Sequence, residues 1–407
     1  MPYRTVEDTP AAPPLAGSYH LPTRVRFGRG TRATLSAELA GRPCLVLTSA
    51  GGSARLAEDD LLGPALRELD ALRLDAVDAN PTVTALDALV AEARDRGWRD
   101  GTIVAIGGGS VLDAAKALAA GLALDTGIGR VARSPALLDA VTVAPIVALP
   151  TTAGSGSEVT PVAVLWHRTP GGGPRTTDDG PAKVSLSHRS LFPVLAIVDP
   201  ALTDTLRAHQ TLATGLDAFN QAAESIWNRH ANALTLPLAT RAMVLAWHAL
   251  PALQREPGDH AARDAMAAAS LLAGTALGQT RTVACHALSY PLTDRYGVTH
   301  GIACAFTMAA VAQHMLASDD GRLAALATEL LGAAAPAEAL PGALDSFLER
   351  LGVAAHVRGA LGSRAALLDL VGEVELPERG GNGLRDVDQA ARRGILEASW
   401  EGLTPGS

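Results

Sequence analysis

Residues 102–123 read TIVAIGGGSVLDAAKALAAGLA, and this stretch decides the fold class. A short apolar run leads into three glycines, and an Ala- and Leu-rich segment follows, which is the order of a strand, a tight turn and a helix. Glycines let a backbone approach a ligand closely, and a helix N-terminus offers free N–H groups to a diphosphate. The stretch predicts a phosphate-binding turn at Gly107, Gly108, Gly109 and Ser110; a tight turn without a ligand is the alternative.

Apolar runs and helical patterns alternate on both sides of this stretch. Strands are predicted at residues 44–48, 72–77, 102–106, 145–149 and 195–198, with helices such as 83–96 and 111–123 between them. This alternation is typical of βαβ units and a largely parallel sheet. Later, apolar residues recur at helical spacing through residues 212–227, 234–250, 261–290 and 301–316. We therefore expect an α/β domain with a mostly parallel sheet over residues 1–205 and an all-helical domain over residues 206–407.

The composition excludes several classes of protein. The chain has 407 residues, of which 48% are hydrophobic and 19% charged, so it is not a disordered chain. Its formal charge of -8, without a basic run, argues against nucleic acid as a partner. The polar, proline-rich start and the absence of a long apolar stretch predict neither a signal peptide nor a membrane span, hence a cytoplasmic protein. A Gly- and Pro-rich segment at residues 169–181 predicts an exposed hairpin tip or excursion.

Cysteine and lysine are rare in this chain. Cys44, Cys285 and Cys304 are widely spaced, which predicts buried thiols rather than disulfides or a Cys-based zinc site. Lys116 and Lys183 are the two lysines among 34 basic residues, so arginine is the usual cation here. A lysine in such a background suggests a position where a compact ammonium is needed, although scattered lysines are also expected by chance.

A second motif, PTTAGSGSEVT at residues 150–160, follows another predicted strand. It places the hydroxyls of Thr151, Thr152 and Ser155 near two glycines. Ligands of open α/β sheets bind at the carboxyl ends of strands, where both motifs are expected. Together the motifs predict a nucleotide site.

The strings GGGSVLDAAK and PTTAGSGSEVT closely resemble the iron-containing, group III alcohol dehydrogenase family. The resemblance implies an N-terminal dinucleotide-binding domain and a C-terminal helical domain, with substrate and metal in the cleft between them. It adds Asp113 of the first motif to the expected cofactor contacts. It also implies that Lys183 reaches the nicotinamide side of the site, where it counts as both a cofactor contact and a catalytic candidate. Lys116 is expected to support the phosphate region or to pack its aliphatic stem.

The same resemblance implies a metal site. In this family an Asp, a His four residues later on the same helix, and two further histidines fourteen residues apart bind a divalent ion. The corresponding positions here are Asp217, Gln221, His286 and His300, with Pro291 expected to end the helix between the last two. An amide oxygen is a weaker ligand than imidazole for Fe(II) or Zn(II), so Gln221 leaves open whether a metal is bound.

The predicted first strand bears on cofactor choice. NAD enzymes commonly place a carboxylate where the ribose hydroxyls bind, because it accepts from them and repels a 2′-phosphate. Here the strand runs into Ser49, Gly51, Gly52 and Ser53 with Arg55 nearby and no carboxylate. This turn resembles that of NADPH-using family members, so NADPH is expected rather than NADH.

Two residues are candidates for the chemistry on the substrate. Tyr290 stands where many members carry a proton-relaying histidine, and a phenol can also donate a proton. Arg281, five residues before His286, is expected on the same helix as that ligand, where its guanidinium suits a phosphonate group. Pairing with a carboxylate such as Glu224 is the alternative for Arg281.

Residues 215–232 and 280–293 look most like the phosphonoacetaldehyde reductase branch of the family. The resemblance implies an NADPH-dependent, metal-dependent reductase, possible as a homodimer, that converts phosphonoacetaldehyde to 2-hydroxyethylphosphonate in a phosphonate pathway. Reduction of 3-phosphonopyruvate and general alcohol dehydrogenase activity are alternatives. From other classes, a dehydroquinate synthase-like lyase and a catalytically inactive nucleotide-binding protein remain open.

Overall fold

The computed structural model describes residues 17–166, 183–373 and 381–403, so the predicted excursion at 169–181 lies outside the described residues. The chain divides into two compact units, Leu21–Leu206 and Arg207–Ser407, and residues preceding Leu21 group with the second unit. The backbone N–H and C=O of His20 both bond the side chain of Gln279, at 2.9 Å each. The expected boundary after residue 205 had assigned these N-terminal residues to the α/β domain.

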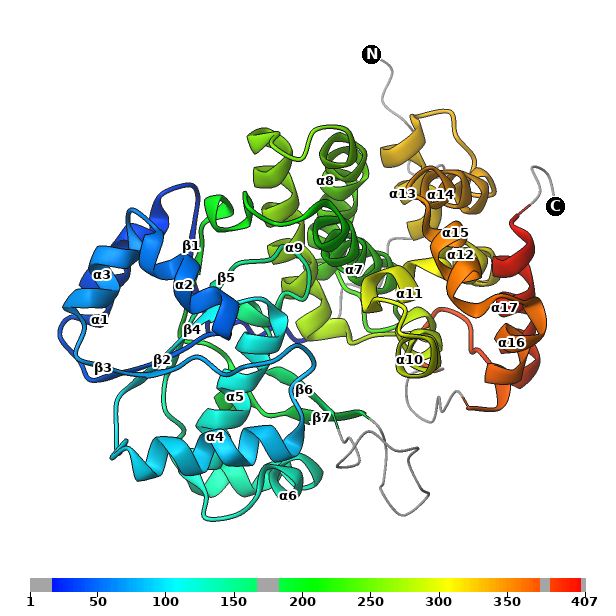
Figure 1. The fold of residues 1–407 in the computed structure, drawn as a ribbon. Coiled ribbons are helices and arrows are strands. Elements are labelled where there is room, and N and C mark those ends of the chain that lie inside the picture. The colour runs from blue at the N-terminus through cyan, green and yellow to red at the C-terminus, as the bar shows by residue number, and fades with distance from the viewer. Residues whose placement is uncertain (1–16, 167–182, 374–380, 404–407) are drawn as a thin grey trace. The chain divides into compact units, whose positions relative to one another are not determined.

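A six-stranded parallel sheet forms the centre of the first unit (Figure 1). Its order is β1-β8-β5-β4-β2-β3, and every pairing is parallel, which confirms the predicted α/β domain. The strands are β1 (Arg24–Phe27), β2 (Cys44–Leu47), β3 (Ala71–Leu74), β4 (Thr102–Gly107), β5 (Ile146–Pro150) and β8 (Leu195–Val198). Three strands were not among those predicted: β1 and the antiparallel pair β6 (Val162–Trp166) and β7 (Lys183–Ser187), although a hairpin tip was one interpretation of the segment between the last two. β1 is an edge strand, RVRF, that is mostly exposed and therefore carries no apolar run.

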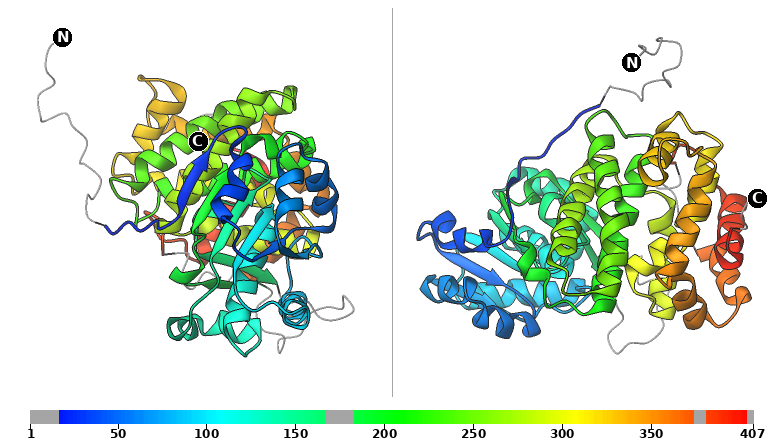
Figure 2. Two further views of the ribbon diagram at one scale, coloured as in Figure 1. Left: turned by 90° about the vertical axis from the view of Figure 1, so that its left-hand side faces the viewer. Right: turned by 90° about the horizontal axis from the view of Figure 1, so that it is seen from above.

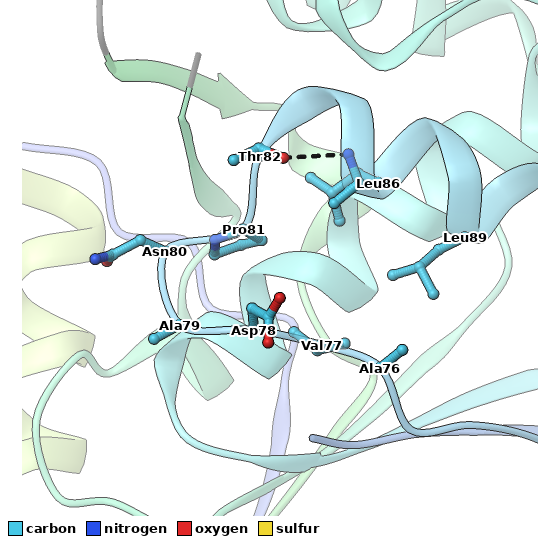
Figure 3. Close-up of a pocket in the computed structure, with 10 residues that line it drawn as sticks. Ala76, Val77, Asp78, Ala79, Asn80, Pro81, Thr82, Leu86 and Leu89 are labelled. Carbon is cyan, nitrogen blue, oxygen red and sulfur yellow. Dashed lines mark hydrogen bonds between the residues drawn. The ribbon is translucent and has the colours of Figure 1, made fainter. Parts of the chain in front are cut away.

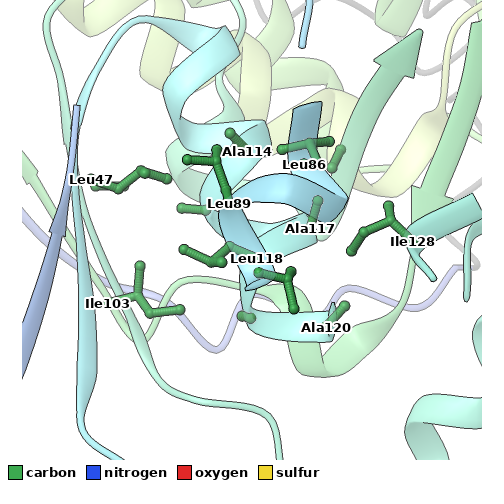
Figure 4. Close-up of a cluster of buried hydrophobic side chains, with 14 of the residues drawn as sticks. Leu47, Leu86, Leu89, Ile103, Ala114, Ala117, Leu118, Ala120 and Ile128 are labelled. Carbon is green, nitrogen blue, oxygen red and sulfur yellow. The ribbon is translucent and has the colours of Figure 1, made fainter. Parts of the chain in front are cut away.

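Helices cover both faces of this sheet because successive strand side chains point to opposite faces. Leu45 and Leu47 of β2 pack into the core formed with helices α4 (Val83–Asp95), α5 (Gly109–Ala123) and α6 (Ile128–Arg133), part of which Figure 4 shows. Cys44 and Val46 of the same strand pack on the other face, against α1 (Leu35–Leu39), α2 (Ala50–Glu58) and α3 (Leu62–Glu68). The fully apolar strands therefore contribute side chains to two hydrophobic cores, one on each face of the sheet.

The strand order creates a switch point between β2 and β4. From β2 the chain continues to β3 through helices on one face, whereas from β4 it continues to β5 through α5 on the other face. All strands are parallel, so the segments after β2, β4 and β5 lie at the same edge. In open α/β sheets this crevice at the carboxyl ends is where ligands bind.

Helices make up the second unit in its described residues, apart from an isolated bridge between Asn228 and Gly383, which confirms the predicted helical domain. Helices α7, α8 and α9 pack side by side (Figure 2). The bounds are α7 (Ala208–Ile226), α8 (Thr235–Arg255), α9 (His260–Thr280), α10 (Ala284–Tyr296), α11 (His300–Phe306), α12 (Met308–Leu316), α13 (Arg322–Leu331), α14 (Ala339–Arg350), α15 (Val353–Leu361), α16 (Arg364–Asp369) and α17 (Gln389–Glu401).

Two boundaries in this unit differ from the prediction. The apolar pattern over residues 261–290 suggested one helix, but the backbone breaks at residues 281–283, where Arg281 has a φ of 67°. Pro291 was expected to end the helix that carries His286, and this is wrong, because α10 continues through Pro291 to Tyr296. Gly297 ends the helix instead: at φ 64° it adopts the left-handed conformation, and its N–H donates to the carbonyl of Thr293 at 3.2 Å.

Helix α8 is long and apolar enough to cross a membrane by length and composition, with a mean hydropathy of 1.2 over 18 residues. The composition had predicted no such stretch. It contacts α7 and α9, and 44% of this window is buried. One such helix is weak support for a membrane span, because core helices of folded domains meet the same criteria.

Helix α11 packs against α7 at unusually short distance because residue 301 is glycine. A Cβ built on Gly301 would lie 1.9 Å from the carbonyl oxygen of Ala213 and 2.8 Å from the backbone nitrogen of Asp217. Real Cβ atoms do not approach a backbone this closely, so a larger residue must separate the two helices. Gly301 thus determines how closely the adjacent residue His300 approaches Asp217 on α7.

We expect Gly301→Ala to lower the free energy of unfolding by roughly 1–3 kcal/mol or more, since the backbone of α7 must move. Gly394→Ala is the matched control. Gly394 is an exposed glycine inside α17 with nothing within 4 Å of its Cβ position, so alanine should stabilise that helix by up to about 1 kcal/mol. Thermal unfolding followed by circular dichroism measures both. Equal shifts for the two variants would show that the contact between α7 and α11 is not under this constraint.

Candidate active site

Gly108 and Gly109, which follow β4, are required by the packing of the second motif. A Cβ on Gly109 would lie 2.7 Å from Ser155 Oγ, and one on Gly108 would lie 3.1 Å from Thr152. The N–H of Thr151 donates to the carbonyl of Gly107 at 3.0 Å. The two predicted motifs therefore meet at the sheet edge, where α5 begins at Gly109 with Gly108 as its N-cap. Both the tight turn and a half-buried helix N-terminus of the kind that binds phosphate are present.

A buried polar network fixes the second motif on α5. Asp113 accepts from Ser157 Oγ at 2.6 Å and from the N–H of Val164 at 2.9 Å, while Lys116 Nζ donates to Ser157 Oγ and to the carbonyl of Val162, both at 2.7 Å. Burial lowers the pKa of Lys116 to about 8, although Asp113 and Glu158 oppose that shift. Lys116 thus connects α5 to the second motif, and its support of a bound phosphate stays a prediction. Asp113 positions the motif through both oxygens, and its contact with a cofactor stays a prediction.

The segment after β2 is the first turn of a helix rather than the expected glycine turn. Ser49 caps α2 by accepting from the N–H of Gly52 at 3.1 Å, and the first turn carries no acidic residue. A Cβ on Gly52 would lie 2.5 Å from Thr48 Oγ1, so this glycine is required by packing. At Gly51 the Cβ position is 3.6 Å from Nη1 of Arg55, which places the guanidinium beside the start of the helix. Ser53, half-buried, follows in the same turn.

A pocket lies beside this edge, along the loop after β3 and the start of α4 (Figure 3). Its lining residues are Ala76, Val77, Asp78, Ala79, Asn80, Pro81, Thr82, Ala85, Leu86 and Leu89. Asn80 has a φ of 56°, and its N–H donates to Ser110 Oγ at 3.1 Å. This bond connects the pocket loop to the glycine motif.

Lys183 is the first residue of β7 and pairs across the hairpin with Trp166. Its ammonium lies 5.6 Å from the centre of the Trp166 ring, within the range of a cation–π contact. The predicted contact of Lys183 with the nicotinamide stays a prediction.

Four potential metal ligands meet in the helical unit: Asp217 on α7, His286 on α10, and His300 and Cys304 on α11. Their ligand atoms all lie within 4.8 Å of one another. Asp217 Oδ1 is 3.4 Å from Nε2 of His286, and the two histidine rings are 5.5 Å apart in a T-shaped arrangement. The structure thus brings together three of the predicted ligands and adds Cys304, which the sequence analysis had assigned to the buried thiols.

Glu224 orients His286. This fully buried carboxylate accepts from Nδ1 of His286 at 2.7 Å and from the N–H groups of Val283 and Cys285 at 2.8 and 2.6 Å. In a neutral His286 ring the proton therefore lies on Nδ1, which leaves Nε2 available to a metal beside Asp217; in the absence of a metal, Nε2 also carries a proton and faces Asp217 Oδ1 at 3.4 Å. Burial by itself would lower the pKa of His286, but the charges of Glu224 and Asp217 outweigh it and raise this pKa to about 9. Glu224 lies seven residues after Asp217 on one helix face, a spacing that the sequence analysis overlooked.

Gln221, the predicted fourth ligand, hydrogen-bonds the carboxylate of Asp217 and helps to lower its pKa against the opposing effect of burial. Its neighbour Asn220 is fully buried, with Nδ2 3.3 Å from Nδ1 of His286. Residue 221 thus lies beside the predicted ligands, and the direct binding of a metal by its amide stays a prediction.

Tyr290 lies close to the cluster. Its ring stacks against that of His300, with 6.2 Å between centroids and 18° between planes. Ser289 Oγ donates to the carbonyl of His286 at 2.7 Å and faces Nδ1 of His300 at 3.3 Å. This assigns the proton of His300 to Nδ1 and the lone pair to Nε2. The ring of Tyr290 therefore lies beside a predicted metal ligand, and its role as a proton donor stays a prediction.

Arg281 does not lie on the helix of His286, so this part of the prediction is wrong. It is an exposed residue in the break between α9 and α10, at φ 67°, and its carbonyl accepts from Asn228 Nδ2 at 3.0 Å. The apolar pattern runs through residues 261–290 and hid this break. Glu224, named as its alternative partner, instead binds His286 and the start of α10.

A nucleotide-type sheet edge and a cluster of divalent-metal ligands define a class of metal-dependent, dinucleotide-binding enzymes. Two family models match the chain: iron-containing alcohol dehydrogenase over residues 22–200, and the C-terminal domain of the Fe-containing alcohol dehydrogenase family over residues 211–362. The chain belongs to the iron-containing alcohol dehydrogenase family.

Individual relatives are similar in sequence to part of this chain. A phosphonoacetaldehyde reductase from Streptomyces viridochromogenes is 39% identical over 259 residues, which are 61% of this chain and 60% of that protein. An NAD-dependent methanol dehydrogenase from Bacillus methanolicus is 34% identical over 62% of this chain and 64% of its own length. The match thus spans about three fifths of each relative. The solved structure of sulfoacetaldehyde reductase from Bifidobacterium kashiwanohense with NAD+ superimposes with a TM-score of 0.80 at 28% identity, covering 95% of this chain and 99% of that one.

We expect Glu224→Gln to weaken the binding of Zn(II) by about 10–100-fold, because the amide cannot accept from His286 Nδ1 and from the N–H groups of α10 at the same time. Isothermal titration calorimetry on chelator-treated protein measures the affinity. Glu329→Gln, the same change at an exposed position of α13, serves as the control. Unchanged zinc affinity in a folded Glu224→Gln variant would show that Glu224 does not orient a metal ligand.

Proposed function

We propose that this protein is a metal-dependent NADPH reductase of a two-carbon aldehyde with an anionic head group, with phosphonoacetaldehyde as its substrate. The family and the cluster of Asp217, His286 and His300 support the reductase chemistry. Two relatives are named for phosphonoacetaldehyde and sulfoacetaldehyde, which share an aldehyde and a tetrahedral oxyacid group. The cluster of metal ligands is the observation that carries the proposal.

The residues of the cluster divide into ligands and positioning groups. When bound, a divalent metal polarises the carbonyl oxygen and the nicotinamide supplies a hydride. Asp217, His286 and His300 would hold the metal, and Glu224 and Ser289 position the two imidazole rings by accepting from Nδ1. Tyr290, stacked on His300, donates the proton that the product alcohol requires, and Lys183 contacts the nicotinamide.

The start of α2 supports NADPH. Its first turn has no carboxylate to repel a 2′-phosphate, and Arg55 lies beside Gly51 at the helix N-terminus, where an anion is favoured. The glycine motif after β4 and the loop from Thr151 to Ser155 bind the diphosphate at the neighbouring strand ends. One relative is named for NAD and another was solved with NAD+. The choice between NADPH and NADH is therefore the first part of the proposal to test.

A dianionic head group needs a cation when it leaves water. Arg281, exposed in the turn that precedes α10 and five residues before His286, remains our candidate. A guanidinium binds a phosphonate through two parallel hydrogen bonds. Cytoplasmic location and a homodimer complete the proposal.

We expect Ser53→Asp to lower the specificity constant for NADPH by about 10–100-fold while changing that for NADH little, since like charges brought together cost a few kcal/mol and each 1.4 kcal/mol is a factor of ten. Ala54→Asp is the matched control, because it adds the same charge at the next, exposed position of α2. Initial rates with each cofactor give both constants. An unmodified enzyme that uses the two cofactors equally would contradict the NADPH assignment.

The substrate is tested by NADPH oxidation with phosphonoacetaldehyde, 3-phosphonopyruvate and propanal, each with and without added Zn(II) or Fe(II). We expect phosphonoacetaldehyde to exceed propanal in specificity constant by at least tenfold, and chelation to abolish the reaction. Faster reduction of 3-phosphonopyruvate would reassign the substrate, and equal rates with propanal would indicate a general alcohol dehydrogenase. No oxidation of NADPH with any substrate would favour the lyase or an inactive protein.

A further inference from the structure

We propose that Cys304 is the fourth protein ligand of the metal, which gives this chain an Asp-His-His-Cys site suited to zinc. The inference deepens the proposed metal-dependent function and rests on it. Cys304 lies one helical turn after His300 on α11, so both side chains project from the same face. Its Sγ is within 4.8 Å of the ligand atoms of Asp217, His286 and His300.

Two of the separations are close to those of a small tetrahedral site. Ligand atoms about 2.0–2.3 Å from a zinc ion lie roughly 3.3–3.6 Å from one another. Asp217 Oδ1 and His286 Nε2 are 3.4 Å apart, and Cys304 Sγ is 3.8 Å from Nε2 and 3.7 Å from Nδ1 of His300. All four ligand atoms lie within 4.8 Å of one another, so binding a metal requires them to move closer together.

The backbone positions Cys304 firmly. The close approach of Gly301 to Ala213 and Asp217 fixes α11 against α7, and Cys304 itself is fully buried. Asp217 Oδ1 is a buried oxygen that accepts no geometrically sound hydrogen bond within the described part of the chain. A buried carboxylate oxygen that faces two histidines and a thiol has the environment of a metal ligand rather than of a structural ion pair.

The glutamine at residue 221 is a reason to expect a thiolate as the fourth ligand. In the resembling family a histidine occupies this position, whereas the Gln221 amide hydrogen-bonds Asp217. An amide is a weak ligand for a borderline metal, and a thiolate is a strong one. With Asp217 and Cys304 both anionic, the ligands neutralise a divalent ion completely. The softer donor set favours Zn(II) over Fe(II).

The test uses Co(II) as a spectroscopic substitute for zinc. A thiolate bound to Co(II) gives an intense near-ultraviolet charge-transfer band that oxygen and nitrogen ligands do not give. We expect the full chain, freed of metal by chelation and loaded with one equivalent of Co(II) without oxygen, to show this band. Cys304→Ser should lose the band and bind Co(II) about 100-fold more weakly or worse, since loss of an outer partner alone costs about 10–100-fold.

The other two cysteines provide matched controls. Cys285→Ser removes a buried thiol of the same unit that is not among the clustered ligands, and Cys44→Ser removes one from the α/β unit. Both variants should keep the band. X-ray absorption of the zinc-loaded, unmodified chain needs no variant and should show one sulfur at about 2.3 Å.

The outcomes separate this inference from the proposed function. Stoichiometric metal binding without a thiolate band or a sulfur neighbour would overturn the role of Cys304 and leave the metal-dependent reductase intact. A band that survives in Cys304→Ser and is lost in Cys285→Ser would reassign the ligand. If the unmodified chain binds no metal yet reduces the aldehyde, both the role of Cys304 and the metal-dependent mechanism are wrong.

Discussion

The buried carboxylate of Glu224 is the interaction on which the helical unit's site depends. One side chain on α7 accepts from the backbone at the start of α10 and from the ring of His286. Val283, at the N-cap of α10, has no side chain that could accept these hydrogen bonds, so the helix is capped from another helix. A carboxylate without a counter-charge would be costly at this depth, and His286 provides it. Helix position and ring orientation are therefore determined by one group.

A second constraint is steric. Gly301 lets α11 approach the backbone of α7, and this approach places His300 and Cys304 near Asp217. Electrostatics orient one histidine and close packing positions the other. The result is a group of ligand atoms from three helices that all lie within 4.8 Å of one another.

In the α/β unit, close packing likewise brings separate motifs together at the sheet edge. Gly109 and Ser155 pack so closely that the two motifs form one surface, and Ser157 connects that surface to Asp113 and Lys116 beneath it. The lysine retained in an arginine-rich chain is fully buried, where a compact ammonium can donate to Ser157 and to a backbone carbonyl. The network explains why these residue types occur together in the sequence.

Sequence patterns alone predicted the α/β unit, the helical unit, the two glycine motifs, and Asp217, His286 and His300 as one set. Apolar periodicity and motif spacing are local properties, and they identified β2, β3, β4, β5 and β8. They could not identify the edge strand β1, because it is mostly exposed and has no apolar run. They also missed the helix break at residues 281–283, because the apolar spacing continues across it. That break removed Arg281 from the helix of His286.

Only the tertiary structure decided which groups surround the ligands. Glu224 lies 62 residues before His286, the histidine that it contacts. Cys304 lies four residues after His300, its own neighbour in the cluster. Cys304 was within reach of a helical-spacing argument, but nothing in the sequence shows whether a cysteine points toward a metal or into a core. Its direction depends on the packing of α11 on α7, which is a property of the folded chain.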